Sequence, residues 1–155
     1  MLIAALSFAL LAQPVPATPK CAAPSACLMQ VAQPHPSVTD GAVLIGMGET
    51  MVVLLDENGG NPQLVATGDD AAKRTLQPGE LRFTMKPMMG TLLTVESQHG
   101  KWLNYRARVG LGGGPATSVC TLMAGKSAFE NWPQAFKGLT LDLFTPTDEG
   151  QMVCR

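Results

Sequence analysis

Charged and aromatic residues are scarce in this chain of 155 residues. Asp, Glu, Lys and Arg together make up 15% of the sequence and aromatic residues make up 5%. The charged share lies below the roughly one quarter that is usual for soluble domains. The apolar share of 46% is still ample for a hydrophobic core, which excludes an intrinsically disordered chain. The net charge is -1, so the composition gives no electrostatic reason to expect a nucleic-acid partner.

Recognisable catalytic patterns are also missing. The only histidines of the sequence are His35 and His99. His35 is flanked by two prolines, and we expect His99 at a solvated hairpin tip. Nucleophilic catalysis needs a Ser or Cys beside a base that a third group orients, and no such set is evident. We therefore expect a non-enzymatic protein without a cofactor. An exported hydrolase with an unfamiliar site is the alternative.

No apolar run is long enough for a retained membrane helix, which needs about 20 residues. Residues 1–12 are apolar apart from Ser7, and they are followed by the small-residue ending Val15-Pro16-Ala17. This pattern is typical of a secretory signal peptide, which we place at residues 1–17. A Pro-rich segment follows at 18–37, and one globular domain is expected at 38–155. The predicted location is periplasmic or secreted, with no stable membrane span.

The four cysteines, Cys21, Cys27, Cys120 and Cys154, all follow the predicted cleavage site. Exported thiols tend to pair, and four cysteines allow three pairings. Proximity along the chain favours Cys21–Cys27 and Cys120–Cys154. The C-x5-C spacing of the first pair does not suit a zinc site.

Short segments of β-type sequence make up the remainder of the chain. We expect strands at 38–48, 50–56, 64–67, 81–86, 91–97, 102–109, 117–122 and 139–144, and a short helix within 68–76. Glycine, proline and an Asn-Gly turn separate these segments, and no long segment has a 3.6-residue apolar period. This pattern predicts an all-β antiparallel sandwich with little helix, immunoglobulin-like as the first choice. A closed barrel is the alternative.

Three pieces in the last third of the chain resemble a pattern in short secreted proteins of Gram-negative bacteria. The pieces are Tyr105-Arg106-Ala107, Thr117-Ser118-Val119-Cys120, and Glu130 with Trp132-Pro133. The resemblance implies a periplasmic location, and it implies no activity or site.

Nine methionines raise the question of a soft metal site, because thioethers select Cu(I). Met85, Met88, Met89 and His99 are the candidate copper ligands. Met85 also belongs to the predicted apolar face of its strand, and methionine commonly fills irregular cores. We therefore favour packing and keep a Met-based Cu(I)-binding protein as an alternative function.

A basic patch is the remaining candidate for binding. Arg82 and Lys86 alternate with apolar residues in one predicted strand, and Trp102, Arg106 and Arg108 do so in another. If the strands are neighbours, this patch could bind a periplasmic protein or an anionic envelope ligand through the arginine forks. A solvated sheet face, with Glu80 and Glu96 between the basic residues, is the alternative that we favour. The expected function is thus an exported, non-enzymatic binding or interaction module.

Overall fold

The computed structural model describes residues 35–148 and 150–155. The predicted signal peptide and the Cys21–Cys27 pair therefore lie outside the described residues. Ten strands and one short helix are found in the described part. In chain order they are β1 (Ser37–Thr39), β2 (Ala42–Gly46), β3 (Thr50–Leu54), β4 (Gln63–Thr67), α1 (Gly68–Lys73), β5 (Glu80–Pro87), β6 (Thr91–Ser97), β7 (Trp102–Val109), β8 (Ala116–Thr117), β9 (Ser127–Trp132) and β10 (Gly138–Thr147).

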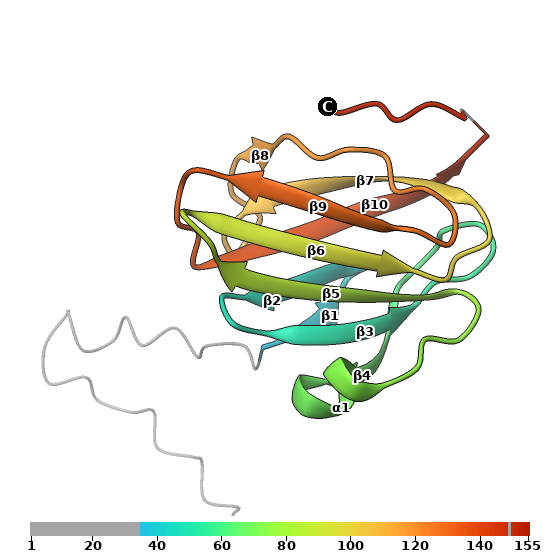
Figure 1. The fold of residues 1–155 in the computed structure, drawn as a ribbon, viewed down its shortest axis with the longest axis horizontal. Coiled ribbons are helices and arrows are strands. Elements are labelled where there is room, and N and C mark those ends of the chain that lie inside the picture. Colours follow the sequence, from blue (N-terminus) through green and yellow to red (C-terminus); the bar gives the residue numbers. More distant parts are fainter. Residues whose placement is uncertain (1–34, 149) are drawn as a thin grey trace, which may run out of the picture. The chain divides into compact units, whose positions relative to one another are not determined.

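The strands form two antiparallel sheets of five strands each, which we call sheet A and sheet B. Sheet A has the order β1-β2-β10-β7-β8, and sheet B has the order β4-β3-β5-β6-β9. Figure 1 shows sheet B in front of sheet A. Each sheet ends in edge strands of its own. The predicted β-sandwich is therefore confirmed, and the alternative of a closed barrel is wrong.

A single hydrophobic cluster fills the space between the sheets, because apolar side chains alternate along most strands. Leu81, Phe83 and Met85 point inward from β5, as the alternation predicts, and all three are fully buried. The rings of Phe83 in sheet B and Phe144 in sheet A lie 6.1 Å apart, centroid to centroid. The predicted core face of β5 is thus correct.

The strand β10 departs from the predicted alternation after Asp142. A β-bulge shifts its register against β7 between Asp142 and Thr145, and Leu143 has a positive φ of 54°. The extra residue turns Leu143 outward, 62% exposed, and turns Phe144 into the core at 7%. The sequence alternation predicted Leu143 on the core face and Phe144 on the outer face. The prediction is wrong for these two residues.

The C-terminal residues are tied to the domain by the predicted disulfide. The Sγ atoms of Cys120 and Cys154 are 1.99 Å apart. Backbone hydrogen bonds join Val119 to Arg155 in both directions, and Thr121 donates to the carbonyl of Val153. The Cys120–Cys154 pairing is confirmed. Among the described residues, no helix has the length and apolar character needed to span a bilayer.

Candidate functional site

The five residues of the predicted basic patch do not come together. Arg82 and Lys86 lie on β5 in sheet B, whereas Trp102, Arg106 and Arg108 lie on β7 in sheet A. Since the polar faces of the two sheets point away from each other, a single patch is impossible. The conditional candidate of one patch across both strands is therefore not formed, because strand neighbours in a sheet depend on pairings that alternation alone does not specify.

On sheet B two arginines are paired with glutamates. Arg82 donates two hydrogen bonds from one guanidinium nitrogen to the Glu96 carboxylate, at 2.9 and 3.1 Å, and a third to the carbonyl of Ala71 in α1. Arg74 forms a two-pronged pair with Glu80, at 2.7 and 3.1 Å. This face matches the ion-paired sheet that the sequence favoured, with both predicted glutamates paired to arginines, but the side chains of Arg82 and Glu80 are only 12% and 5% exposed.

On sheet A two arginines share one carboxylate. Arg106 donates from Nε and from a terminal nitrogen to the two oxygens of Asp142, at 2.8 and 3.0 Å. Arg108 donates to the same carboxylate at 2.6 Å. Register explains the arrangement, because Asp142 lies directly opposite Arg106 and diagonally opposite Arg108 on the antiparallel pair of β10 and β7. Two positive charges therefore face one negative charge.

The ionisation of Asp142 follows from this geometry. Burial raises the pKa of the carboxyl, but the hydrogen bonds and charges of Arg106 and Arg108 outweigh burial and leave the pKa below its ordinary value. Asp142 is thus a fixed anion with both oxygens engaged. It is not suited to act as a general base, which needs a free oxygen and a pKa near the working pH.

A hollow of about 450 Å³ opens on the outer face of sheet A above this group. Its floor includes Arg108, Thr140 and Asp142 from β7 and β10, and the exposed Leu143 lies at the bulge beside them. Leu44 of β2 and Phe144 of β10 also line it, and most of the remaining lining comes from three connections: the β1–β2 turn, the loop between β3 and β4, and the loop after β7. A hollow of this size, with a few convergent polar groups and apolar side chains, is typical of a ligand site.

Glycines let two of these connections approach the floor. Gly59 has a φ of +73°, and a Cβ atom there would lie 2.8 Å from the carbonyl oxygen of Phe144. Gly113 has a φ of +74°, and a Cβ atom would lie 2.8 Å from a terminal nitrogen of Arg108. In the sequence these glycines only separate predicted strands, which gives no signal that they line a shared hollow.

The Arg108 guanidinium has donor capacity left. One terminal nitrogen binds Asp142, and the other lies 3.5 Å from the carbonyl of Gly113. Its Nε atom is buried and has no hydrogen-bond partner. An unpaired buried donor is costly, and because this nitrogen is buried, an acceptor from a ligand or from solvent reaches it only when the Arg108 side chain shifts. Trp102 shares the outer face of β7 but lies six residues from Arg108, about 20 Å along an extended strand.

A second hollow, of about 660 Å³, contains His99 with Asp56, Glu57 and Lys101. The ring of His99 is only 3% exposed, so the prediction of a solvated turn residue is wrong. Its Nε2 lies 3.0 Å from the carbonyl of Asp56, and its Nδ1 accepts from the Lys101 backbone N–H at 3.2 Å. Both nitrogens serve to hold loops together, which argues against a catalytic base here.

The four copper candidates are also dispersed. Met85 is fully buried in the core, and Met88 and Met89 lie in the connection from β5 to β6, 53% and 93% exposed. His99 follows β6, at the opposite end of that strand. In residues 35–148 and 150–155, no group of three His, Cys, Asp or Glu side chains could hold a metal ion.

The three pieces of the Gram-negative resemblance do come together. Glu130 of β9 is buried and accepts hydrogen bonds from the Cys120 N–H, at 2.8 Å, and from the Tyr105 hydroxyl, at 3.3 Å. The indole N–H of Trp132 donates to the carbonyl of Ser118 at 3.1 Å. These contacts link β7, the segment after β8, and β9, so these residues serve the packing of one sandwich edge.

Comparison of this chain with protein-family models, with curated proteins and with solved structures finds no match.

Proposed function

We propose that this chain is an exported, non-enzymatic binding module, and that its ligand places a carboxylate or phosphate group in the hollow of sheet A. The observation that carries the proposal is Arg108, which lies in the floor of the hollow, keeps 30% of its side chain exposed and has one guanidinium donor without a partner. Guanidinium groups bind carboxylate and phosphate oxygens through parallel N–H donors. The proposed location is the periplasm or the cell exterior.

The surroundings favour binding over reaction. The carboxylate of Asp142 is held by three N–H donors and fixes the two arginines in place. Apolar surface from Leu143 and Leu111 adjoins the polar floor, so the ligand carries a less polar part next to its anionic group. This arrangement recognises a shape and a charge and supplies no activated nucleophile.

The proposal is tested by titrating isotope-labelled mature protein with glucuronate, with inorganic phosphate and with neutral glucose, and following backbone amide shifts by NMR. We expect glucuronate or phosphate to shift the amides of Asn61, Gly113 and Leu143, and glucose to leave them unchanged. The shifts should weaken as salt is added, because the contact is charged.

Arg108→Gln is the critical variant, and Arg74→Gln is its matched control. Both remove one guanidinium from a partly exposed ion pair, but only Arg108 lines the hollow. The anion-induced shifts should vanish in the first variant and persist in the second. Anions that leave the hollow unshifted, or shifts that survive Arg108→Gln, would rule the proposal out.

A further inference from the structure

Two exposed methionines lie outside the hydrophobic core and do not line the hollow of sheet A. Met88 and Met89 lie at the tip of the β5–β6 connection, and their side chains are 53% and 93% exposed. Methionine ordinarily fills gaps in a core. Two consecutive thioethers at a solvated tip contribute little packing and therefore call for another explanation.

The tip is held in a fixed conformation. Gly90, with a φ of +129°, lies so close to the backbone of Trp132 that a Cβ atom there would overlap its carbonyl oxygen. The hydroxyl of Thr91 donates to the carbonyl of Gln134 and accepts from the N–H of Phe136, both at 2.8 Å. Met89 itself has a φ of 45°, a conformation that costs free energy for a residue with a side chain. The backbone of the tip is thus held in one conformation, which fixes the positions of the Met88 and Met89 Cα atoms.

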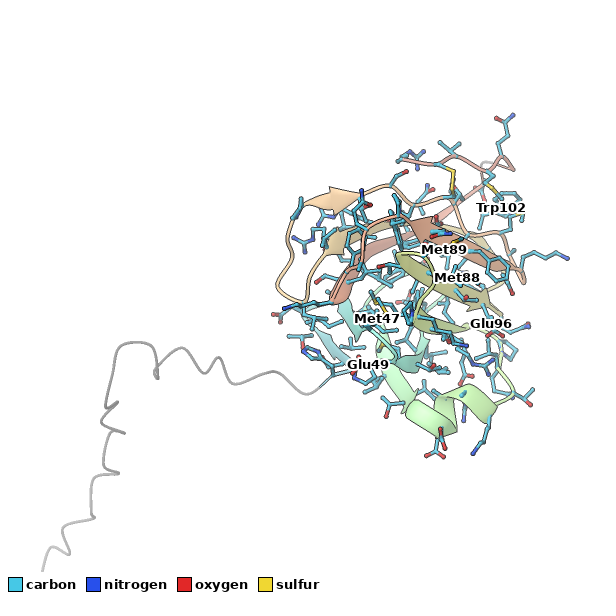
Figure 2. All side chains as sticks on the ribbon, turned by 60° about the vertical axis from the view of Figure 1, so that its left-hand side comes forward. Met47, Glu49, Met88, Met89, Glu96 and Trp102 are labelled. Atoms are coloured by element: carbon cyan, nitrogen blue, oxygen red, sulfur yellow. A yellow bond between two sulfur atoms is a disulfide. The ribbon has the colours of Figure 1, made fainter. Side chains whose placement is uncertain are left out.

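A third methionine lies on the neighbouring connection. The N–H of Gly48 donates to the carbonyl of Met85 at 2.9 Å, and the N–H of Met85 donates to the carbonyl of Glu49 at 3.0 Å. Met47 is therefore one residue from this cross-strand contact, and Met88 is three residues from it. Figure 2 shows Met47, Met88 and Met89 at the same end of the sandwich.

The connection that carries Met47 is also braced. The carboxylate of Glu49 accepts from the N–H of Gly46 at 2.6 Å, and the N–H of Met47 donates to the carbonyl of Lys137 at 3.0 Å. The Met47 side chain is partly buried and packs against the edge of the hydrophobic core, so part of it remains exposed. Long, unbranched thioether side chains on two adjacent, braced connections can converge by rotation about their side-chain bonds.

We propose that Met47, Met88 and Met89 form a Cu(I) site with three thioether ligands. Soft thioethers select Cu(I) over hard cations. Met47 takes the place of the buried Met85 and the distant His99 that the sequence suggested. The site shares no residue with the hollow of sheet A. A negative result for copper binding would therefore leave the proposed function unaffected, and the reverse also holds.

The test measures Cu(I) binding by the purified mature protein in competition with a chromophoric Cu(I) chelator. Ascorbate serves as the reductant, and thiol alkylation verifies that the Cys120–Cys154 disulfide stays intact. We expect one equivalent of Cu(I) to bind. The side-chain methyl signals of Met47, Met88 and Met89 should shift in NMR spectra, while that of the buried Met51 should not.

Replacing the three methionines with leucine separates ligation from packing, since leucine is close to methionine in volume. Each single variant should bind Cu(I) at least about tenfold more weakly, and the triple variant should not bind it. Met152→Leu is the matched control, because Met152 is 56% exposed but lies in the C-terminal segment. Absent binding in the wild type, or binding retained by the triple variant, would overturn the proposal.

Discussion

Glu130 links three parts of the chain through a single buried carboxylate. It is 6% exposed, and its Oε1 atom accepts from the Cys120 N–H and from the Tyr105 hydroxyl. Burial, followed by the charge and the hydrogen bond of Glu130, raises the pKa of Tyr105 well above its ordinary value. Sequence reasoning could not anticipate this contact, because Glu130 is an acidic residue on the core side of its strand, where periodicity predicts an apolar one.

Replacing Glu130 with alanine should lower the free energy of unfolding by about 2 to 3 kcal/mol, because the Cys120 N–H then loses its acceptor inside the protein and a cavity opens. Glu57→Ala is the control, since Glu57 is exposed, and it should change stability by less than about 0.5 kcal/mol. Urea unfolding followed by circular dichroism measures both. Equal stability of the two variants would contradict the role given to Glu130.

Acid should weaken the fold partly through Asp142. Its pKa is lowered in the folded protein, so the folded state binds the proton less tightly than the unfolded chain does. Its contribution is complete above the unfolded pKa of about 3.9 and is lost as the pH falls through the lower folded value. The urea midpoint, measured from about pH 6 down to pH 2, should fall less steeply in Asp142→Asn. An unchanged slope would show that Asp142 does not titrate in this way.

The strand β10 determines both the core and the hollow. Its first half follows the predicted alternation, with Leu139 and Leu141 inward. The bulge then reverses the facing of Leu143 and Phe144, and the ring of Phe144 stacks on Tyr105, with centroids 5.9 Å apart. A bulge adds one residue with no strong compositional mark, so a regular period of two does not reveal it.

Most strand positions could be predicted from the sequence, because apolar alternation and turn residues act locally. The predicted segments 91–97 and 102–109 coincide with β6 and β7, and residues 68–76 contain α1. The strand β9 was missed. Its inward positions hold Ala128, Glu130 and Trp132, while Phe129 points outward and is 69% exposed, so its pattern contradicts the usual burial preferences.

Gly59→Ala should test how closely the β3–β4 loop must approach β10. The added methyl group would lie 2.6 Å from Cδ of Pro146, and the left-handed backbone adds strain. We expect a loss of about 2 to 4 kcal/mol in unfolding free energy. Gly112→Ala is the control, because a Cβ there meets no atom within 4 Å and its φ is not positive. Thermal and urea unfolding compare the two, and similar stabilities would argue against the close approach.

The assembly of the two sheets depends on pairing between strands that are far apart in the sequence. The pairing of β10 with both β2 and β7 places Arg106 and Arg108 in a different sheet from Arg82. No local pattern in the sequence carries that information, which is why the candidate site could be predicted only in part. The arginines of β7 were found, but their partner Asp142 and the loops around the hollow were not.

Removing the disulfide with Cys154→Ser should destabilise the fold by about 4 kcal/mol on the chain-entropy model, since the bridged residues are 34 positions apart. Cys27→Ser should cost about half as much if the predicted Cys21–Cys27 pair forms, because its loop is shorter. Urea unfolding under non-reducing conditions compares the two. A larger loss for Cys27→Ser would contradict this ranking.

The central position of β10 also has a consequence for the order in which the domain can fold. Among β3, β4, β5 and β6, each strand pairs with another that is near it in the sequence. In contrast, Val43 of β2 pairs with Leu141 of β10, which is nearly 100 residues later. Non-local pairing is slow because a long chain segment must first be closed into a loop. While the chain emerges from a ribosome or a translocation pore, the apolar strand β2 can pair with β1 along one edge, but its other edge stays unpaired until β10 arrives. The nascent chain is then most prone to aggregate through β2. A chaperone that shields an apolar strand would prevent this aggregation.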